Sequence, residues 1–236
     1  MSFPVFETLS VLRGSPRYNA WLYSHIEPHL GGRVLDIGSG LGDIARQFAH
    51  PLVEEVIFSD RAEEMIRALE TSPVPLKKYR ILPLDISSPQ MHRSPLSGPV
   101  DTITCINVLE HIEDDVAALE NMNSLLRIGG KVVVFVPALP VLYGTLDSYV
   151  EHYRRYTKRK LVMVFERAGF AVKSAYYINM FGIFTWFLAG RVLKQKKFDK
   201  CVCRMLDRAV PLLRTMESFG PPPLGQSLIM VGEKVS

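Results

Sequence analysis

The run RVLDIGSGLG at residues 33–42 decides the fold. Its first half, Arg33–Ile37, has the length and the apolar character of a buried β-strand. Its second half holds three glycines at alternate positions, and glycine lets the backbone turn tightly and approach a ligand where a Cβ would clash. We expect a helix over residues 43–50, so that the loop presents the free N–H groups of a helix N-terminus. Glycine also occurs in tight strand–helix turns that bind no ligand, so the role of this loop has to be inferred together with other motifs in the chain.

Strand-like and helix-like segments alternate on both sides of this loop. Strands that alternate with helices of about ten residues are typical of right-handed βαβ units and of a mostly parallel sheet covered on both faces. We therefore predict an α/β fold: a Rossmann-like, doubly wound, mostly parallel seven-stranded sheet, with helices on both faces and a helical insertion before the last strand. The strands are expected at residues 33–37, 53–59, 79–84, 100–107, 131–136, 171–178 and 227–232, and the helices at 16–30, 43–50, 61–70, 114–126, 158–168, 181–193 and 198–219.

Length and composition favour a single folded domain. The chain has 236 residues, of which 47% are hydrophobic and 22% are charged. These values are close to the globular average and exclude a disordered or a collagen-like protein. We divide the domain into a helical lead-in, a core that contains the glycine loop, a set of loops with a basic helical insertion, and a last strand, at residues 1–30, 33–137, 138–225 and 226–236.

Cysteine usage and the N-terminus bear on the compartment. The three cysteines form neither a zinc-binding spacing nor a disulfide framework, so we expect a reducing compartment, the cytoplasm. The N-terminal residues lack a basic start followed by a long apolar core and are not expected to be a secretory signal.

Charge is distributed unevenly along the chain. Residues 1–153 contain 12 Lys/Arg and 19 Asp/Glu, whereas residues 154–214 contain 15 Lys/Arg and 3 Asp/Glu. The acidic first part argues against a uniformly basic nucleic-acid binder, and no RNA-binding module is recognisable, so nucleic acid is not an expected partner. The basic late part predicts contact with something anionic or with a membrane face.

Acidic residues stand at the ends of several predicted strands. Asp60 ends the second strand, 18 residues after Gly42, where a Rossmann-like fold places an acid on the hydroxyls of a ribose. Asp85 ends the third strand, and NVLEH follows the fourth at residues 107–111. A dinucleotide-binding fold and a methyltransferase fold both fit in outline. The alternate spacing of the glycines departs from the dinucleotide fingerprint G-x-G-x-x-G/A, which favours the second.

Together these motifs resemble those of the class I S-adenosylmethionine-dependent methyltransferases. The resemblance extends over residues 33–137 and is looser elsewhere. It implies the cofactor S-adenosylmethionine and says little about the methyl acceptor. By position it implies that Gly38, Gly40 and Asp36 cradle the methionine part, Asp60 and Arg61 hold the ribose, Asp85 and Ile86 meet the adenine, Asn107 lines the methionine end, and Tyr18 folds over the cofactor.

Two histidines are candidates for catalysis. Methyl transfer is an in-line displacement, and a hydroxyl acceptor also needs a base to remove its proton. His111 follows the fourth strand, next to the methyl-donating end that the resemblance implies. His152 lies in EHYRRY at residues 151–156, after the fifth strand, where this fold places acceptor loops. A neutral imidazole has a suitable pKa at physiological pH, while a structural, hydrogen-bonded role stays open for either residue.

Glu110 and His111 also resemble the metal-binding segment of the quinone-type O-methyltransferases. In that segment a further acid stands three residues before the glutamate, and Asn107 occupies this position here. The substitution removes an anionic ligand, so no metal is expected.

The region at residues 175–219 is unusual in a second way. Residues 175–190, AYYINMFGIFTWFLAG, are strongly apolar, and five Lys/Arg follow within residues 191–200. Such a basic, aromatic-rich amphipathic pair fits a peripheral contact with a membrane surface, a lid over a hydrophobic acceptor, or plain packing on the sheet.

The sequence thus predicts a methyltransferase that uses S-adenosylmethionine and acts on a small, partly hydrophobic acceptor, at oxygen. Three alternatives stay open: an enzyme that uses the same cofactor for non-methylating chemistry such as cyclisation, an RNA methyltransferase, and a non-catalytic cofactor-binding scaffold.

Overall fold

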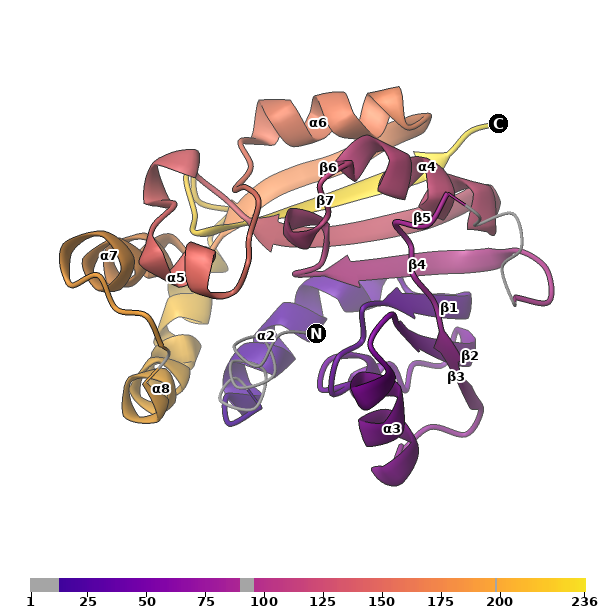
Figure 1. Cartoon of the computed structure of the whole chain (residues 1–236), viewed down its shortest axis with the longest axis horizontal. Helices are drawn as coiled ribbons and strands as arrows, with labels where there is room; N and C mark the ends of the chain where they lie inside the picture. The colour runs from indigo at the N-terminus through magenta and orange to yellow at the C-terminus, as the bar shows by residue number, and fades with distance from the viewer. Residues whose placement is uncertain (1–12, 90–95, 198) are drawn as a thin grey trace.

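The computed structural model describes residues 13–89, 96–197 and 199–236, and a single seven-stranded sheet runs through it (Figure 1). The strand order is β3-β2-β1-β4-β5-β7-β6. The strands β1 to β5 pair in parallel, and β7 runs antiparallel to both of its neighbours. The predicted mostly parallel seven-stranded sheet is therefore confirmed. The bounds are Gly32–Ile37, Val53–Asp60, Tyr79–Pro83, Val100–Ile106, Leu126–Pro137, Phe170–Ile178 and Ser227–Lys234 for β1 to β7.

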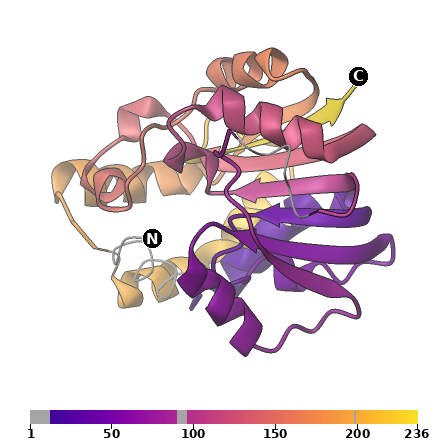
Figure 2. The same ribbon diagram turned by 45° about the vertical axis from the view of Figure 1, so that its right-hand side comes forward.

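Helices cover both faces of the sheet, as predicted. In Figures 1 and 2, α4 and α6 lie on one face, while α3 lies on the other. Two large hydrophobic cores lie among the described residues: one packs α4 and α6 against the sheet, and the other packs α2 against it, with single side chains from α3 and α8. A third, small cluster joins Leu41 of the glycine loop to Ala62 and to Met65 of α3. The helices are α2 Pro16–Ile26, α3 Glu63–Thr71, α4 Asp115–Leu125, α5 Thr145–Tyr149, α6 Lys158–Arg167, α7 Met180–Phe187 and α8 Lys200–Glu217.

The prediction of a helix at residues 43–50 is wrong. The chain forms only a short 3-10 turn there, η2 at Ala45–Gln47. Pro51 follows directly, and a proline disfavours the helical conformation of the residue before it, so the segment is too short for an α-helix. The glycine loop is therefore followed by a turn, and β2 starts soon after it. Most of the expected lead-in helix is present as α2, and residues 1–12 of the lead-in lie outside the described residues.

The first five strands place their carboxyl ends at one edge of the sheet. The chain order reverses between β1 and β4, since β2 and β3 lie on one side of β1 and the later strands on the other. In open parallel sheets a ligand site forms beside this switch point, outside the carboxyl ends of the strands. The residues after β1, β2 and β4 are those that the sequence analysis selected.

The helical insertion lies between β6 and β7, as predicted. It consists of α7, a π-helical turn η6 at Leu188–Val192, and α8. Figure 1 shows α5, α7 and α8 gathered at the end of the sheet toward which β4 and β5 point. No helix in the described ranges combines the length and the apolar character needed to cross a bilayer.

Candidate active site

A cavity of about 420 Å³ opens at the carboxyl ends of the central strands. This volume lies within the range of about 300–1,000 Å³ that is typical of small-molecule sites. Every residue that the sequence analysis selected lines it. These residues come from the lead-in helix, the glycine loop, the ends of β2, β3 and β4, and the segment after α5: Tyr18, Asp36, Gly38, Gly40, Asp60, Arg61, Asp85, Ile86, Asn107, His111 and His152.

The glycine loop adopts a conformation that only glycine fits well. Gly38 and Gly40 have φ angles of 64° and 54°, in the left-handed region. A Cβ added to Gly38 would lie 2.5 Å from a methyl carbon of Val108. The loop can therefore pass close beneath a ligand without a side chain in the way.

Asp60 braces this loop from the neighbouring strand. It is only 3% exposed, and its two carboxylate oxygens accept hydrogen bonds from the backbone N–H of Gly40, at 3.0 Å, and of Ala62, at 2.9 Å. Burial raises the pKa of the carboxyl, and the two backbone hydrogen bonds oppose that shift. Each oxygen keeps a second lone pair, so the carboxylate can still accept hydrogen bonds from a ligand's hydroxyl groups.

Two further acids have different surroundings. Asp36 is buried, accepts a 2.6 Å hydrogen bond from the Thr104 hydroxyl, and so links β1 to β4. Burial raises the pKa of Asp36 to about 6, against the effect of the Thr104 hydrogen bond. Asp85 is exposed, and one of its oxygens accepts from the backbone N–H and the hydroxyl of Ser87. Asp85 thus caps the following turn and leaves its other oxygen for a ligand.

Tyr18 and Asn107 complete this half of the cavity. The backbone N–H of Tyr18 donates to Asp207 of α8 at 2.9 Å, so the lead-in helix is tied to the insertion. Burial raises the pKa of the Tyr18 phenol to about 12, and a hydrogen bond with Ser227 opposes the shift. Asn107 has a φ of 52°, and its backbone N–H donates to the Phe135 carbonyl, so it forms the sharp turn after β4.

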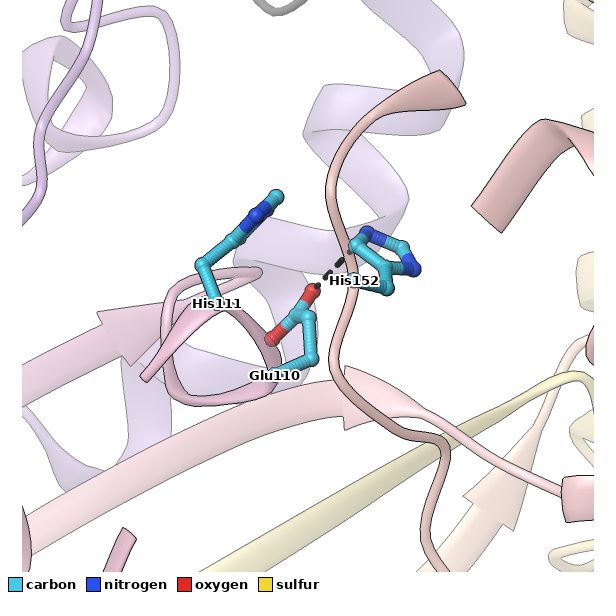
Figure 3. A group of neighbouring side chains, drawn as sticks. All are labelled: Glu110, His111 and His152. Carbon is cyan, nitrogen blue, oxygen red and sulfur yellow. Dashed lines mark ion pairs between the residues drawn. The ribbon is translucent and has the colours of Figure 1, made fainter. Parts of the chain in front are cut away.

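The other half of the cavity holds a cluster of Glu110, His111 and His152 (Figure 3). The first two lie in the 3-10 turn η4, Leu109–His111, directly after β4, and the third follows α5. Their potential ligand atoms all lie within 4.8 Å of one another. His152 Nε2 is 3.8 Å from Glu110 Oε1, and the two imidazole rings meet edge-on with centroids 4.7 Å apart. The two histidines selected from the sequence are therefore neighbours.

Asp147 orients His152, and the sequence analysis missed it. Its buried carboxylate lies 2.9 Å from His152 Nδ1 and also accepts from Arg155 Nε and Trp186 Nε1. Burial opposes ionisation, but these hydrogen bonds and the Arg155 charge hold the pKa of Asp147 below its ordinary value. An ionised carboxylate only accepts, so Nδ1 carries the hydrogen and Nε2 of a neutral His152 has the free lone pair. The only signal in the sequence is an acid five residues before His152.

Burial also shifts the other two members of the cluster. Burial raises the pKa of Glu110 to about 7, although the charges of His152 and Arg155 act in the opposite direction. Burial, reinforced by the nearby His152, lowers the pKa of His111 to about 3, and a hydrogen bond with the Glu151 backbone opposes the shift. His111 is therefore a neutral imidazole at physiological pH.

A family model described as a methyltransferase domain matches residues 17–175. Among curated proteins, a ubiquinone biosynthesis O-methyltransferase of Xanthomonas euvesicatoria is 32% identical over 106 residues, which is 43% of this chain and 41% of that protein. A ubiquinone/menaquinone biosynthesis C-methyltransferase of a Shewanella species is 32% identical over 109 residues, 44% of this chain and 42% of that protein. The match thus spans about two-fifths of the length of these relatives.

Among solved structures, the fold is similar to that of magnesium protoporphyrin IX methyltransferase from Synechocystis with bound S-adenosylhomocysteine (SAH). The TM-score is 0.57 at 14% identity, and the match covers 94% of this chain and 84% of that one.

Proposed function

The chain belongs to the methyltransferase-domain family and is an S-adenosylmethionine-dependent methyltransferase, and we propose that it methylates an oxygen atom of a small, partly hydrophobic acceptor. The Xanthomonas relative is named for O-methylation and the Shewanella relative for C-methylation, so the family alone leaves the acceptor atom open. The choice of oxygen rests on the oriented histidine of the cavity.

We place the cofactor along the sheet edge of the cavity. The methionine part lies over Gly38 and Gly40 near Asp36, and Asn107 and Tyr18 close this end. Asp60 accepts from the ribose hydroxyls with Arg61 beside it, and Asp85 and Ile86 meet the adenine. Support comes from the shared cavity and from the spare acceptor capacity of Asp60 and Asp85.

The acceptor then occupies the half of the cavity near His111 and His152. The cofactor's S–CH₃ bond breaks as the O–CH₃ bond forms, SAH leaves, and the acceptor hydroxyl loses its proton. Methylation at carbon also releases a proton, but from the carbon, after the new bond has formed. A hydroxyl has to give up its proton as it attacks, and a fixed imidazole lone pair beside the acceptor suits that step. The observation that carries the proposal is the 2.9 Å contact between Asp147 and His152 Nδ1 at the cavity wall. This contact fixes the tautomer and the orientation of the imidazole, so that the lone pair of Nε2 is free. We assign the removal of the proton to His152. His111, whose lowered pKa makes it a weak base, lines the same half of the cavity.

The insertion supports an acceptor with apolar parts. Its inner side lines the cavity with Phe181, Trp186, Leu206 and Val210. Its outer side exposes many large apolar side chains, such as Phe184 at 68%, Met205 at 62% and Leu212 at 66%. Only Asp207 and Val210 of α8 are buried, which argues against plain packing on the sheet.

We therefore propose two roles for residues 175–219: a lid over the acceptor and a peripheral contact with a membrane surface. Exposed apolar side chains would enter the interface while the following Lys/Arg residues meet anionic headgroups. An acceptor could then reach the cavity directly from the bilayer.

The test is methyl transfer from isotopically labelled S-adenosylmethionine into a lipid and metabolite extract, with mass analysis of the product. We expect a methyl ether or ester. A product methylated on carbon, an RNA product, or a cyclised product without added mass would each overturn the proposal. His152→Ala should lower the rate and leave the affinity for SAH unchanged.

A further inference from the structure

Glu110 is a buried acid without a hydrogen-bond partner. Its side chain is fully inaccessible, and neither carboxylate oxygen has a hydrogen-bond partner among the residues that the structure describes. His152 Nε2, at 3.8 Å, is too far for a hydrogen bond. Buried charged groups are normally paired or bound to a metal, because desolvation without compensation is costly. The carboxylate therefore lacks a partner that a cation would supply.

The two histidines beside it are arranged as metal ligands usually are. A metal-bound imidazole almost always donates its other ring N–H to a carboxylate or a backbone carbonyl, which sets its tautomer and its orientation. Asp147 does this for His152, and the Glu151 backbone interacts in the same way with His111. In each ring one nitrogen is held in place and the other is available.

We propose that Glu110, His111 and His152 bind a divalent first-row transition metal cation, of which Zn²⁺ is the representative. Zinc lies about 2.0–2.2 Å from such ligands, so the ligand atoms around it stand roughly 3–4 Å apart. The separations here, all within 4.8 Å, need only a small contraction. Two imidazoles and one carboxylate suit transition metals, whereas Mg²⁺ and Ca²⁺ prefer oxygen ligands. Both histidines line the cavity, which leaves room for a further ligand.

The charges around the cluster favour a cation. The negative charge of Asp147 is matched by Arg155, which donates to it from Nε at 2.7 Å and to the Ala138 carbonyl from Nη1. Arg155 makes no hydrogen bond to Glu110 and acts on it only through its charge. When a cation binds, Glu110 supplies one anionic oxygen beside the two imidazoles. Asn107 offers no anionic ligand, but the fold brings His152 from a distant segment of the chain to complete a set of three ligands.

The binding site stands on this geometry alone, but its use in catalysis rests on the proposed function. A hydroxyl bound to such a cation becomes more acidic, as metal-bound water does, and would lose its proton more readily before methyl transfer. With the cation bound, the free lone pair of His152 would be a metal ligand, so this histidine would act on the acceptor through the cation and not as a free base.

The experiment titrates the metal-stripped full chain with Co²⁺, followed by visible absorption and calorimetry, and then displaces Co²⁺ with Zn²⁺. We expect one ion per chain. Glu110→Gln and His152→Gln should each weaken binding by on the order of a hundredfold, and Asp147→Asn by about tenfold to a hundredfold as a positioning residue. Mg²⁺ should not compete.

Matched controls separate the site from surface binding and from misfolding. Glu113→Gln changes an exposed acid three residues away, and His50→Ala changes a histidine in the turn before β2, so both should leave cation affinity unchanged. Glu110→Gln removes an unpartnered buried acid, so the metal-free variant should be at least as stable to heat as the wild type.

The outcomes distinguish this site from the proposed function. A wild-type chain that binds SAH and transfers methyl groups but takes up neither Co²⁺ nor Zn²⁺ overturns the metal site and leaves the function standing. Unchanged cation affinity in folded Glu110→Gln overturns it as well. Binding that this variant abolishes supports the site, even if no acceptor is methylated.

Discussion

The two halves of the cavity are built in different ways. In the cofactor half, Asp60 and the glycine loop are joined by backbone hydrogen bonds across adjacent strands, and the acids of that half have defined partners. In the acceptor half, a buried glutamate has no hydrogen-bond partner among the described residues, and the insertion exposes apolar side chains. The acids of the first half are hydrogen-bonded within the protein. In the second half, the buried glutamate and the exposed apolar side chains lack contacts that a cation, an acceptor or a membrane surface would supply, so substitutions in the two halves should have different consequences.

The largest effect should come from the loop itself. Gly38→Val forces a β-branched side chain into a left-handed backbone conformation and against Val108, where an added Cβ would lie only 2.5 Å away. We expect no measurable SAH binding in calorimetric titration. Cation uptake at the acceptor half should persist if the variant folds, as circular dichroism will show. Normal SAH affinity in Gly38→Val would contradict the placement of the cofactor over the loop.

The basic part of the insertion should control membrane binding. Each Lys near an anionic surface contributes about 1 kcal/mol, so replacing Lys194, Lys196 and Lys197 with Gln should lower binding to phosphatidylglycerol-containing vesicles by on the order of a hundredfold. The matched control is the triple Gln variant of residues 158–160, which removes three charges from exposed positions at the start of α6, on a different part of the surface. Equal losses in both variants, or no sedimentation of the wild type at low salt, would argue against the membrane contact.

Asp60→Ala should have an intermediate effect on cofactor binding. A hydrogen bond to a charged group contributes about 1.5–3 kcal/mol, so SAH affinity should fall by about tenfold to a hundredfold. The exposed Glu63, at the start of α3, gives the control variant Glu63→Ala. Calorimetry that finds equal SAH affinity in Asp60→Ala and the wild type would remove the ribose assignment.

The cofactor half could be predicted from the sequence to a greater extent than the acceptor half. The glycine loop and Asp60 lie at the ends of consecutive strands, so local patterns place them, and all seven strands follow from such patterns. The expected helix after the loop does not form, because Pro51 leaves a segment too short for an α-helix. The residue types within 43–50 do not reveal that limit. Asp147 and the contact between Glu110 and His152 depend on how the segment after α5 returns to β4. No local periodicity carries that information, nor the hydrogen bond between Tyr18 and Asp207, 189 residues apart.

The smallest effect concerns Asp36, and it separates stability from binding. Burial raises the pKa of Asp36 to about 6, above the value of about 3.9 for an unfolded chain. Between these two values the folded state binds more protons than the unfolded state, so stability falls as pH rises from about 4 to 6 and stays low above that. Asp36→Asn keeps an acceptor for the Thr104 hydroxyl but cannot ionise. Urea unfolding should therefore show the variant gaining on the order of 1–3 kcal/mol over the wild type at pH 7 relative to pH 4. At pH 7 the same variant should bind S-adenosylmethionine more weakly, because it no longer offers a negative charge to the ammonium group of the methionine part. A parallel pH dependence in both proteins would show that the buried carboxylate carries no such cost, whereas a more stable variant with undiminished affinity would take Asp36 out of the cofactor half.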